Sequence, residues 1–158
     1  MRRTGVHFAP TEDEVQQIWD AYDREDDPAV RAIVEAIESR WDKPNLQQTD
    51  KAWEAIHRSL GDEWPLSGAI LGGECVYFGD DYVVRLVDSD NVKEISTALA
   101  GVTYDWFAER FALLENVKEY TGAADADDLE STWSWFEELR AFFTRMATEG
   151  RAILFTAC

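Results

Sequence analysis

Cysteine is scarce in this chain of 158 residues, with Cys75 and Cys158 as its two examples. Two thiols cannot build the multi-bridge framework of a small secreted protein, and they are too few for a cysteine-based metal site. Long apolar runs are also missing, since nothing approaches the roughly 20 residues that a membrane-spanning helix needs. The first residues are basic but no apolar run follows them, which is unlike a signal peptide. We therefore expect no disulfide, metal, cofactor or membrane segment.

Positive charge is in short supply. The chain has 15 lysines and arginines against 32 aspartates and glutamates, which gives a formal net charge of −17. Phosphate backbones and anionic lipid surfaces carry the same sign, so we expect no binding to nucleic acid or membranes. A protein with a basic surface would be attracted instead. The alternative is that the charge only keeps the protein soluble.

Known catalytic motifs are missing as well. Gly72 and Gly73 follow an apolar run, but no P-loop lysine follows them and their spacing is not a dinucleotide-binding fingerprint. Cys75 is expected to be inert packing, because a lone buried thiol is usually unreactive. Asp80 and Asp81 are expected in a solvated turn, since hard cations need more carboxylates at defined offsets. No residue is assigned a catalytic role.

Apolar residues are plentiful, at 46% of the chain, and aromatic residues make up 13%. A chain of this length buries roughly 68–70% of the surface of its unfolded form, which is enough for one core. We therefore predict a single domain over residues 1–158. The clearest helical stripe comprises Leu129, Trp133, Phe136, Leu139, Phe143 and Met146.

Helices dominate the predicted secondary structure. Thr11 and Glu14 form a capping box, which predicts a helix that begins at residue 12. A second helix is expected to bury apolar residues up to Trp41, and Asp50 is expected to cap a third helix that Gly61 ends. The predicted helices begin near residues 12, 28, 50, 89, 103 and 128.

Strands are fewer and lie far apart in the sequence. They are predicted at 4–9, 83–87 and 152–155, and the last has so little polar alternation that it should be central in its sheet. Residues 42–49 and 62–82 are predicted to be loops. The pattern favours an α+β fold, with several amphipathic helices packed on a small three- to four-stranded mixed or antiparallel sheet.

A set of segments resembles the YfbM-like family of small bacterial proteins of unknown function (DUF1877). The segments are a Gly-containing strand with a Thr-capped acidic helix (4–14), an Asp-Lys-Ala-Trp helix ending in Ile-His (50–57), a Pro-Leu and Ala-Ile-Leu-Gly-Gly stretch (65–73), a strand with a capped turn (85–89), and a Phe-Glu-x-Leu-Arg-x-Phe-Phe helix (136–143) before an apolar strand (153–155).

The resemblance implies a YfbM-like fold and a bacterial, cytoplasmic setting, but no activity, because the family has none established. It spans nearly the whole chain. The stretch 112–127 departs from the usual aromatic, proline-containing segment of the family. Glu54 stands where the family has a second histidine, so any role of that histidine is missing here.

One group of residues is a candidate ligand or partner pocket. Asp50, Trp53 and His57 would share one side of the predicted third helix, where a carboxylate raises the basicity of an imidazole. Tight turns at glycine let backbone approach a ligand. The candidate residues are Asp50, Trp53, His57, Gly72, Gly73 and Glu74. The alternative is structural, with a helix cap, a histidine at the edge of the core and a tight turn.

These observations favour a non-catalytic cytoplasmic binding protein, a monomer or weak dimer, whose partner has a basic surface. An immunity-like protein that neutralises a nuclease toxin would be an example. The alternative is a small enzyme or ligand-binding protein that uses the pocket near Asp50, His57 and Gly72-Gly73.

Overall fold

A five-stranded antiparallel sheet forms the middle layer of the protein. A computed structural model of the chain describes residues 4–117 and 126–158, and within these residues the strand order is β2-β1-β5-β4-β3. The strands are β1 (Gly5–Phe8), β2 (Leu46–Asp50), β3 (Glu74–Gly79), β4 (Tyr82–Val87) and β5 (Ile153–Ala157). Every residue of β5 is buried, and the strand lies between β1 and β4. The prediction of a central last strand is confirmed.

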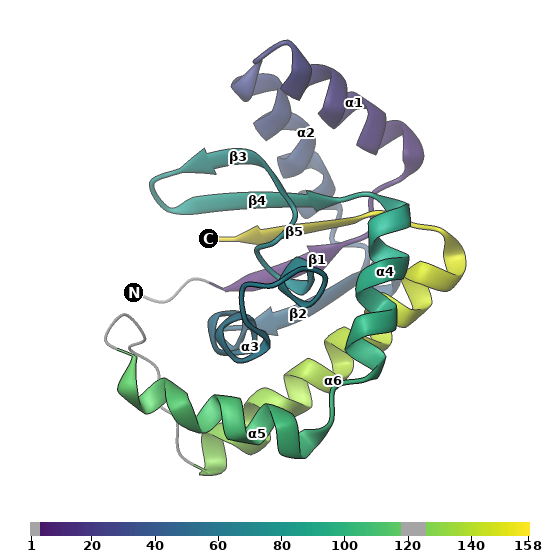
Figure 1. Cartoon of the computed structure of the whole chain (residues 1–158). Coiled ribbons are helices and arrows are strands. Elements are labelled where there is room, and N and C mark those ends of the chain that lie inside the picture. The colour runs from purple at the N-terminus through teal and green to yellow at the C-terminus, as the bar shows by residue number, and fades with distance from the viewer. Residues whose placement is uncertain (1–3, 118–125) are drawn as a thin grey trace.

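Helices cover both faces of the sheet (Figure 1). The first face carries α1 (Glu12–Asp23) and α2 (Asp27–Arg40). The opposite face carries α3 (Trp53–Leu60), α4 (Ser89–Ala100) and α6 (Ala126–Glu149), and α5 (Tyr104–Ala112) packs beside α3 and α6. Three short 3-10 helices, η1 (Lys43–Asn45), η2 (Leu66–Ala69) and η3 (Leu113–Asn116), join these elements. The α+β class is confirmed.

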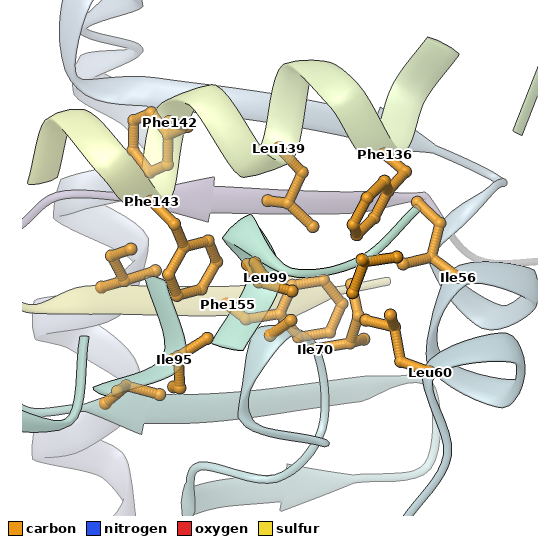
Figure 2. Packing of buried hydrophobic residues seen from close by; sticks show 14 of the residues in the cluster. Ile56, Leu60, Ile70, Ile95, Leu99, Phe136, Leu139, Phe142, Phe143 and Phe155 are labelled. Atoms are coloured by element: carbon orange, nitrogen blue, oxygen red, sulfur yellow. The ribbon is translucent and has the colours of Figure 1, made fainter. Parts of the chain in front are cut away.

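The larger core lies between the sheet and α4 and α6. Figure 2 shows Phe136, Leu139 and Phe143 of α6 pointing toward Leu99 of α4 and Phe155 of β5. All five side chains are buried. Burial of each such side chain contributes roughly 1.5–3 kcal/mol relative to leaving it exposed. The apolar stripe predicted from residue 129 onward therefore anchors the longest helix.

The two edge strands of the sheet form where the sequence predicted loops. β2 falls mostly within residues 42–49 and β3 within 62–82, so the predicted count of three or four strands was too low. β2 is polar, and β3 has an irregular register between Cys75 and Tyr77. Edge strands tolerate polar residues and bulges because one side of each lacks a neighbouring strand. Their sequences therefore lack the alternation that marks a buried strand.

Two helix ends also differ from the prediction. Asp50 is the last residue of β2, with a φ of 47°, and α3 begins at Trp53 after Ala52 without a side-chain cap. Asp50 is therefore not a helix cap. Trp41 ends α2 in the left-handed conformation and stays 39% exposed, so it is not a core residue.

The stretch that departs from the family pattern is described in part. Residues 113–116 form η3 directly after α5, and Val117 follows in an extended conformation. Residues 118–125 lie outside the described part of the chain.

Candidate functional site

The predicted pocket residues fall in separate places. Trp53 and His57, one turn apart on α3, line a cleft of about 500 Å³, which we call the His57 cleft. Asp50 is exposed at the end of β2 and does not line this cleft. The Glu74 carboxylate accepts a hydrogen bond of 2.7 Å from the Tyr22 hydroxyl of α1, on the other face of the sheet.

The carboxylate beside His57 is Asp62. His57 Nε2 lies 3.7 Å from Asp62 Oδ1, and Nδ1 is buried with no hydrogen-bond partner among the described residues. Burial lowers the pKa of His57; Asp62 opposes this shift, while Arg58 and Arg85 add to it. The imidazole is therefore neutral at pH 7. Sequence reasoning missed Asp62 because it lies beyond the helix, after Gly61.

Charged side chains from two helices enclose the rest of the cleft. On α3, Arg58 Nε lies 3.2 Å from Glu54 Oε2, an ion pair across one helical turn. On α5, Arg110 Nε donates to the carbonyl oxygen of Ser59, and its guanidinium lies 4.7 Å from the centroid of the Trp106 ring. The carbonyl is in the last turn of α3, where a cation is favoured by the helix dipole. Arg110 thus connects α5 to the end of α3.

Gly61 makes room for that connection. Its φ is +92°, and a Cβ added there would lie 2.7 Å from Arg110 Nη2. A side chain would therefore strain the backbone and displace the guanidinium. The remaining wall of the cleft is apolar and comes from Trp53, Leu71, Leu113, Leu114 and Val117.

Gly72 and Gly73 pack closely against other parts of the protein. A Cβ on Gly72 would lie 2.6 Å from the carbonyl carbon of Ser67, and one on Gly73 would lie 2.9 Å from the Leu86 carbonyl oxygen. Arg85 Nη1 lies 3.4 Å from the carbonyl oxygen of Gly73. Gly72 therefore permits close packing against η2, and Gly73 permits it against β4.

A second cleft, of about 690 Å³, lies between α2 and the turn that joins β3 to β4. Glu35 and Glu38 contribute from α2, and Asp80 and Asp81 contribute from the turn, with Arg31 as the one cation in its lining. We call it the acidic cleft. Sequence reasoning placed Asp80 and Asp81 correctly in a turn but missed the cleft, since α2 lies some forty residues away.

Polar contacts hold the acidic cleft in shape. Arg31 Nε lies 2.6 Å from Glu35 Oε1, and Arg31 Nη1 donates to the Tyr77 hydroxyl at 3.0 Å. Glu38 accepts from the Tyr82 hydroxyl and, at 3.1 Å, from Thr156. Burial and the hydrogen bond to Glu38 raise the pKa of Tyr82, so it stays a phenol. With Tyr82 uncharged, the charged side chains in the lining are four carboxylates and one guanidinium.

A third cleft, of about 630 Å³, lies beside α1 and the start of α4 and is also acidic. Glu12, Asp13, Asp88 and Asp90 line it together with Arg151. The Asp88 carboxylate accepts a hydrogen bond of 3.0 Å from the Trp19 indole and makes no hydrogen bond as a helix cap.

Across residues 4–117 and 126–158, no group of three or more His, Cys, Asp or Glu side chains is arranged to hold a metal ion. None of the helices in these ranges has the length and apolar character needed to cross a membrane.

Comparison with known proteins gives a family and a fold. A family model described as a domain of unknown function, DUF1877, matches residues 1–156. The crystal structure of YfbM from Escherichia coli, itself a protein of unknown function, is similar with a TM-score of 0.71 and 18% sequence identity. The similarity covers 98% of this chain and 99% of that one. No curated protein matches the chain.

Proposed function

The chain belongs to the DUF1877 family of proteins of unknown function, and we propose that it is a non-catalytic cytoplasmic protein that binds a partner with a basic surface. The acidic cleft is the observation that carries this proposal. Its lining holds four carboxylates and one guanidinium. Such a concentration of one sign of charge raises the local field and speeds the encounter with an oppositely charged partner.

An exposed aromatic side chain is adjacent in sequence to the acidic cleft, although it does not line it. Phe78 is 72% exposed, the most of any large apolar side chain that the structure describes, and the residue after it, Gly79, lines the cleft. Aromatic anchors with a polar rim are typical of protein interfaces. Phe78 also lies on β3, an edge strand, and such strands can add a strand from a partner.

The partner class follows from the charge. Proteins that bind nucleic acids carry clustered lysine and arginine side chains, so a nuclease-type protein is an example of a suitable partner. Solubility alone would require charge spread over the surface, with no particular place for Phe78 or the cleft. The two interpretations therefore predict different results when the acidic cleft is changed. Partner binding is lost if the cleft is a docking site, and it is not specifically affected if the charge serves solubility alone.

The test compares two variants of equal charge as baits. The variant F78S/D80N/D81N changes the acidic cleft and the exposed aromatic residue of β3, while E94Q/E137Q removes the same charge from exposed positions on α4 and α6. We expect a partner captured from native lysate in low salt to be released by high salt and by the first variant. The control variant should retain it. The purified partner should then bind the wild-type protein in a titration.

The proposal is rejected if no partner is captured at either salt concentration. It is also rejected if the two variants lose the partner equally, because that result would show a dependence on total charge alone.

A further inference from the structure

Arg110 is a cation without an acidic partner among the residues that the structure describes, in a protein that is acidic overall. Its described contacts are the Ser59 carbonyl oxygen and the ring of Trp106. None of the ion pairs among the described residues includes it. A guanidinium has five N–H groups, and these two contacts leave several of them to bind an anion. Arg110 lines the His57 cleft, so such an anion has space beside it.

The other charges of the His57 cleft do not cancel Arg110. Glu54 and Arg58 neutralise each other across 3.2 Å. The Asp62 side chain is 99% exposed and is therefore screened by water at the rim. The cleft is thus less negative than the acidic cleft and the third cleft, where carboxylates outnumber cations four to one.

Arg85 adds positive charge behind the cleft. Its Nε is buried without a hydrogen-bond partner among the described residues, and Nη1 is held weakly, at 3.4 Å, by the Gly73 carbonyl. It is close enough to His57 to act on it electrostatically. This second guanidinium also lacks an ion pair with the described carboxylates.

The rest of the wall suits an apolar body. Trp53, Leu71 and Val117 line the cleft, and Leu113 does so while remaining 64% exposed. A volume of about 500 Å³ falls within the range of small-molecule sites, roughly 300–1,000 Å³. Such sites combine an apolar lining with a few polar groups that orient the ligand.

From these observations we infer that the His57 cleft binds a small organic carboxylate, with the carboxylate on Arg110 and the apolar part against Leu71, Leu113 and Trp53. Arginine suits this role because its planar fork can pair with both oxygens of a carboxylate. Gly61 supports it by leaving space for the guanidinium at the end of α3. The site is separate from the acidic cleft and needs no macromolecular partner.

The first test uses 3-phenylpropionate as the probe and its uncharged amide as the matched control, titrated into the whole protein by calorimetry. We expect saturable binding of the acid, with the amide weaker by about tenfold or more, as hydrogen bonds to charged groups imply. The inference fails if the acid shows no saturable binding at concentrations up to about 10 mM. It also fails if acid and amide bind equally.

The second test uses variants at the rim of the cleft. Because Leu113 is largely exposed, L113D and L113K should both fold, and they differ by two charges at one position. We expect L113D to weaken binding of the acid at least about fivefold relative to L113K, by like-charge repulsion. Equal affinities of the two variants would overturn the inference.

Substitution of the arginine itself completes the test. R110Q should reduce affinity about tenfold or more, while R24Q, between α1 and α2 on the other face of the sheet, should not change it. Thermal unfolding of R110Q shows whether the variant still folds cooperatively. A folded R110Q that binds the acid as the wild type does would exclude Arg110 as the carboxylate contact.

Discussion

At the scale of single residues, His7 is a buried ionisable side chain. It lies on β1 and is 1% exposed, with Nε2 2.7 Å from the Ala69 carbonyl oxygen. The rings of Phe143 and Phe155 pack against it. Burial lowers the pKa of His7 to about 4, and the hydrogen bond to Ala69 offsets only part of that shift. The imidazole is therefore neutral in the folded protein near pH 7.

This histidine should make the protein sensitive to mild acid. Its pKa is 6.5 in the unfolded chain and about 4 in the folded state, so the unfolded chain binds more protons between these values. The contribution of His7 is complete above pH 6.5 and is lost as the pH falls to about 4, by about 3 kcal/mol in total. Urea unfolding of wild type and H7Q at several pH values measures it. Carboxylates titrate in both proteins, so the difference between the curves isolates His7, and parallel curves would contradict the prediction.

At the scale of elements, Glu14 connects the start of α1 to the end of α2. Its backbone N–H donates to Thr11 Oγ1 at 3.2 Å, and its carboxylate accepts from the Thr11 N–H at 2.8 Å. The same carboxylate binds the Arg40 guanidinium through two hydrogen bonds, of 2.7 and 3.0 Å. The capping box predicted from Thr11 and Glu14 is confirmed, and it also orients the two helices of that layer.

Loss of the Thr11 cap should lower the free energy of unfolding by a small but measurable amount. T11A removes the acceptor for the Glu14 N–H and should lower the free energy of unfolding by about 1 kcal/mol, while T11S should retain most of it. T97A is the matched control, because Thr97 is exposed within α4 and its hydroxyl bonds only the Lys93 carbonyl. Denaturant titration of the three variants measures the effect. A T11A protein as stable as T97A would show that the cap contributes nothing.

Elements with a local signal were predictable, and those defined by their neighbours were not. The apolar stripe of α6 recurs every three or four residues, and the apolar residues of β5 are consecutive. Both can therefore be recognised from a short stretch of sequence. By contrast, β2 is polar and is a strand because β1 pairs with it. The candidate site divides in the same way. His57 was found from its helix, but Arg110 meets the end of that helix from 51 residues away in the chain, and no local pattern indicates that contact.

At the scale of the whole molecule, negative charge dominates. The net charge is −17, and in two of the three clefts described above acidic side chains outnumber basic ones four to one. Repulsion between these groups destabilises the compact state, because folding brings like charges together. The apolar cores on the two faces of the sheet offset this cost.

Salt should therefore stabilise the protein. Raising NaCl from about 20 mM to about 500 mM shortens the Debye length to a few ångströms, and we expect the free energy of unfolding to rise by on the order of 1 kcal/mol. Urea unfolding at both concentrations checks this. The variant D80N/D81N/E94Q/E137Q should show a smaller rise. A fall in stability with salt would mean that ion pairs such as Glu14–Arg40 outweigh the repulsion.

Because β5 lies between β1 and β4, the sheet can be completed in a cell only after β5 has been synthesised. β1 pairs with β2 and β5, and β4 pairs with β3 and β5, so residues 153–157 are the link between the two pairs. A ribosome makes the chain from its first residue onward, at about 5–20 residues per second. Until β5 has been made, the nascent polypeptide can form these two strand pairs only as separate units, with no hydrogen-bonded bridge between them.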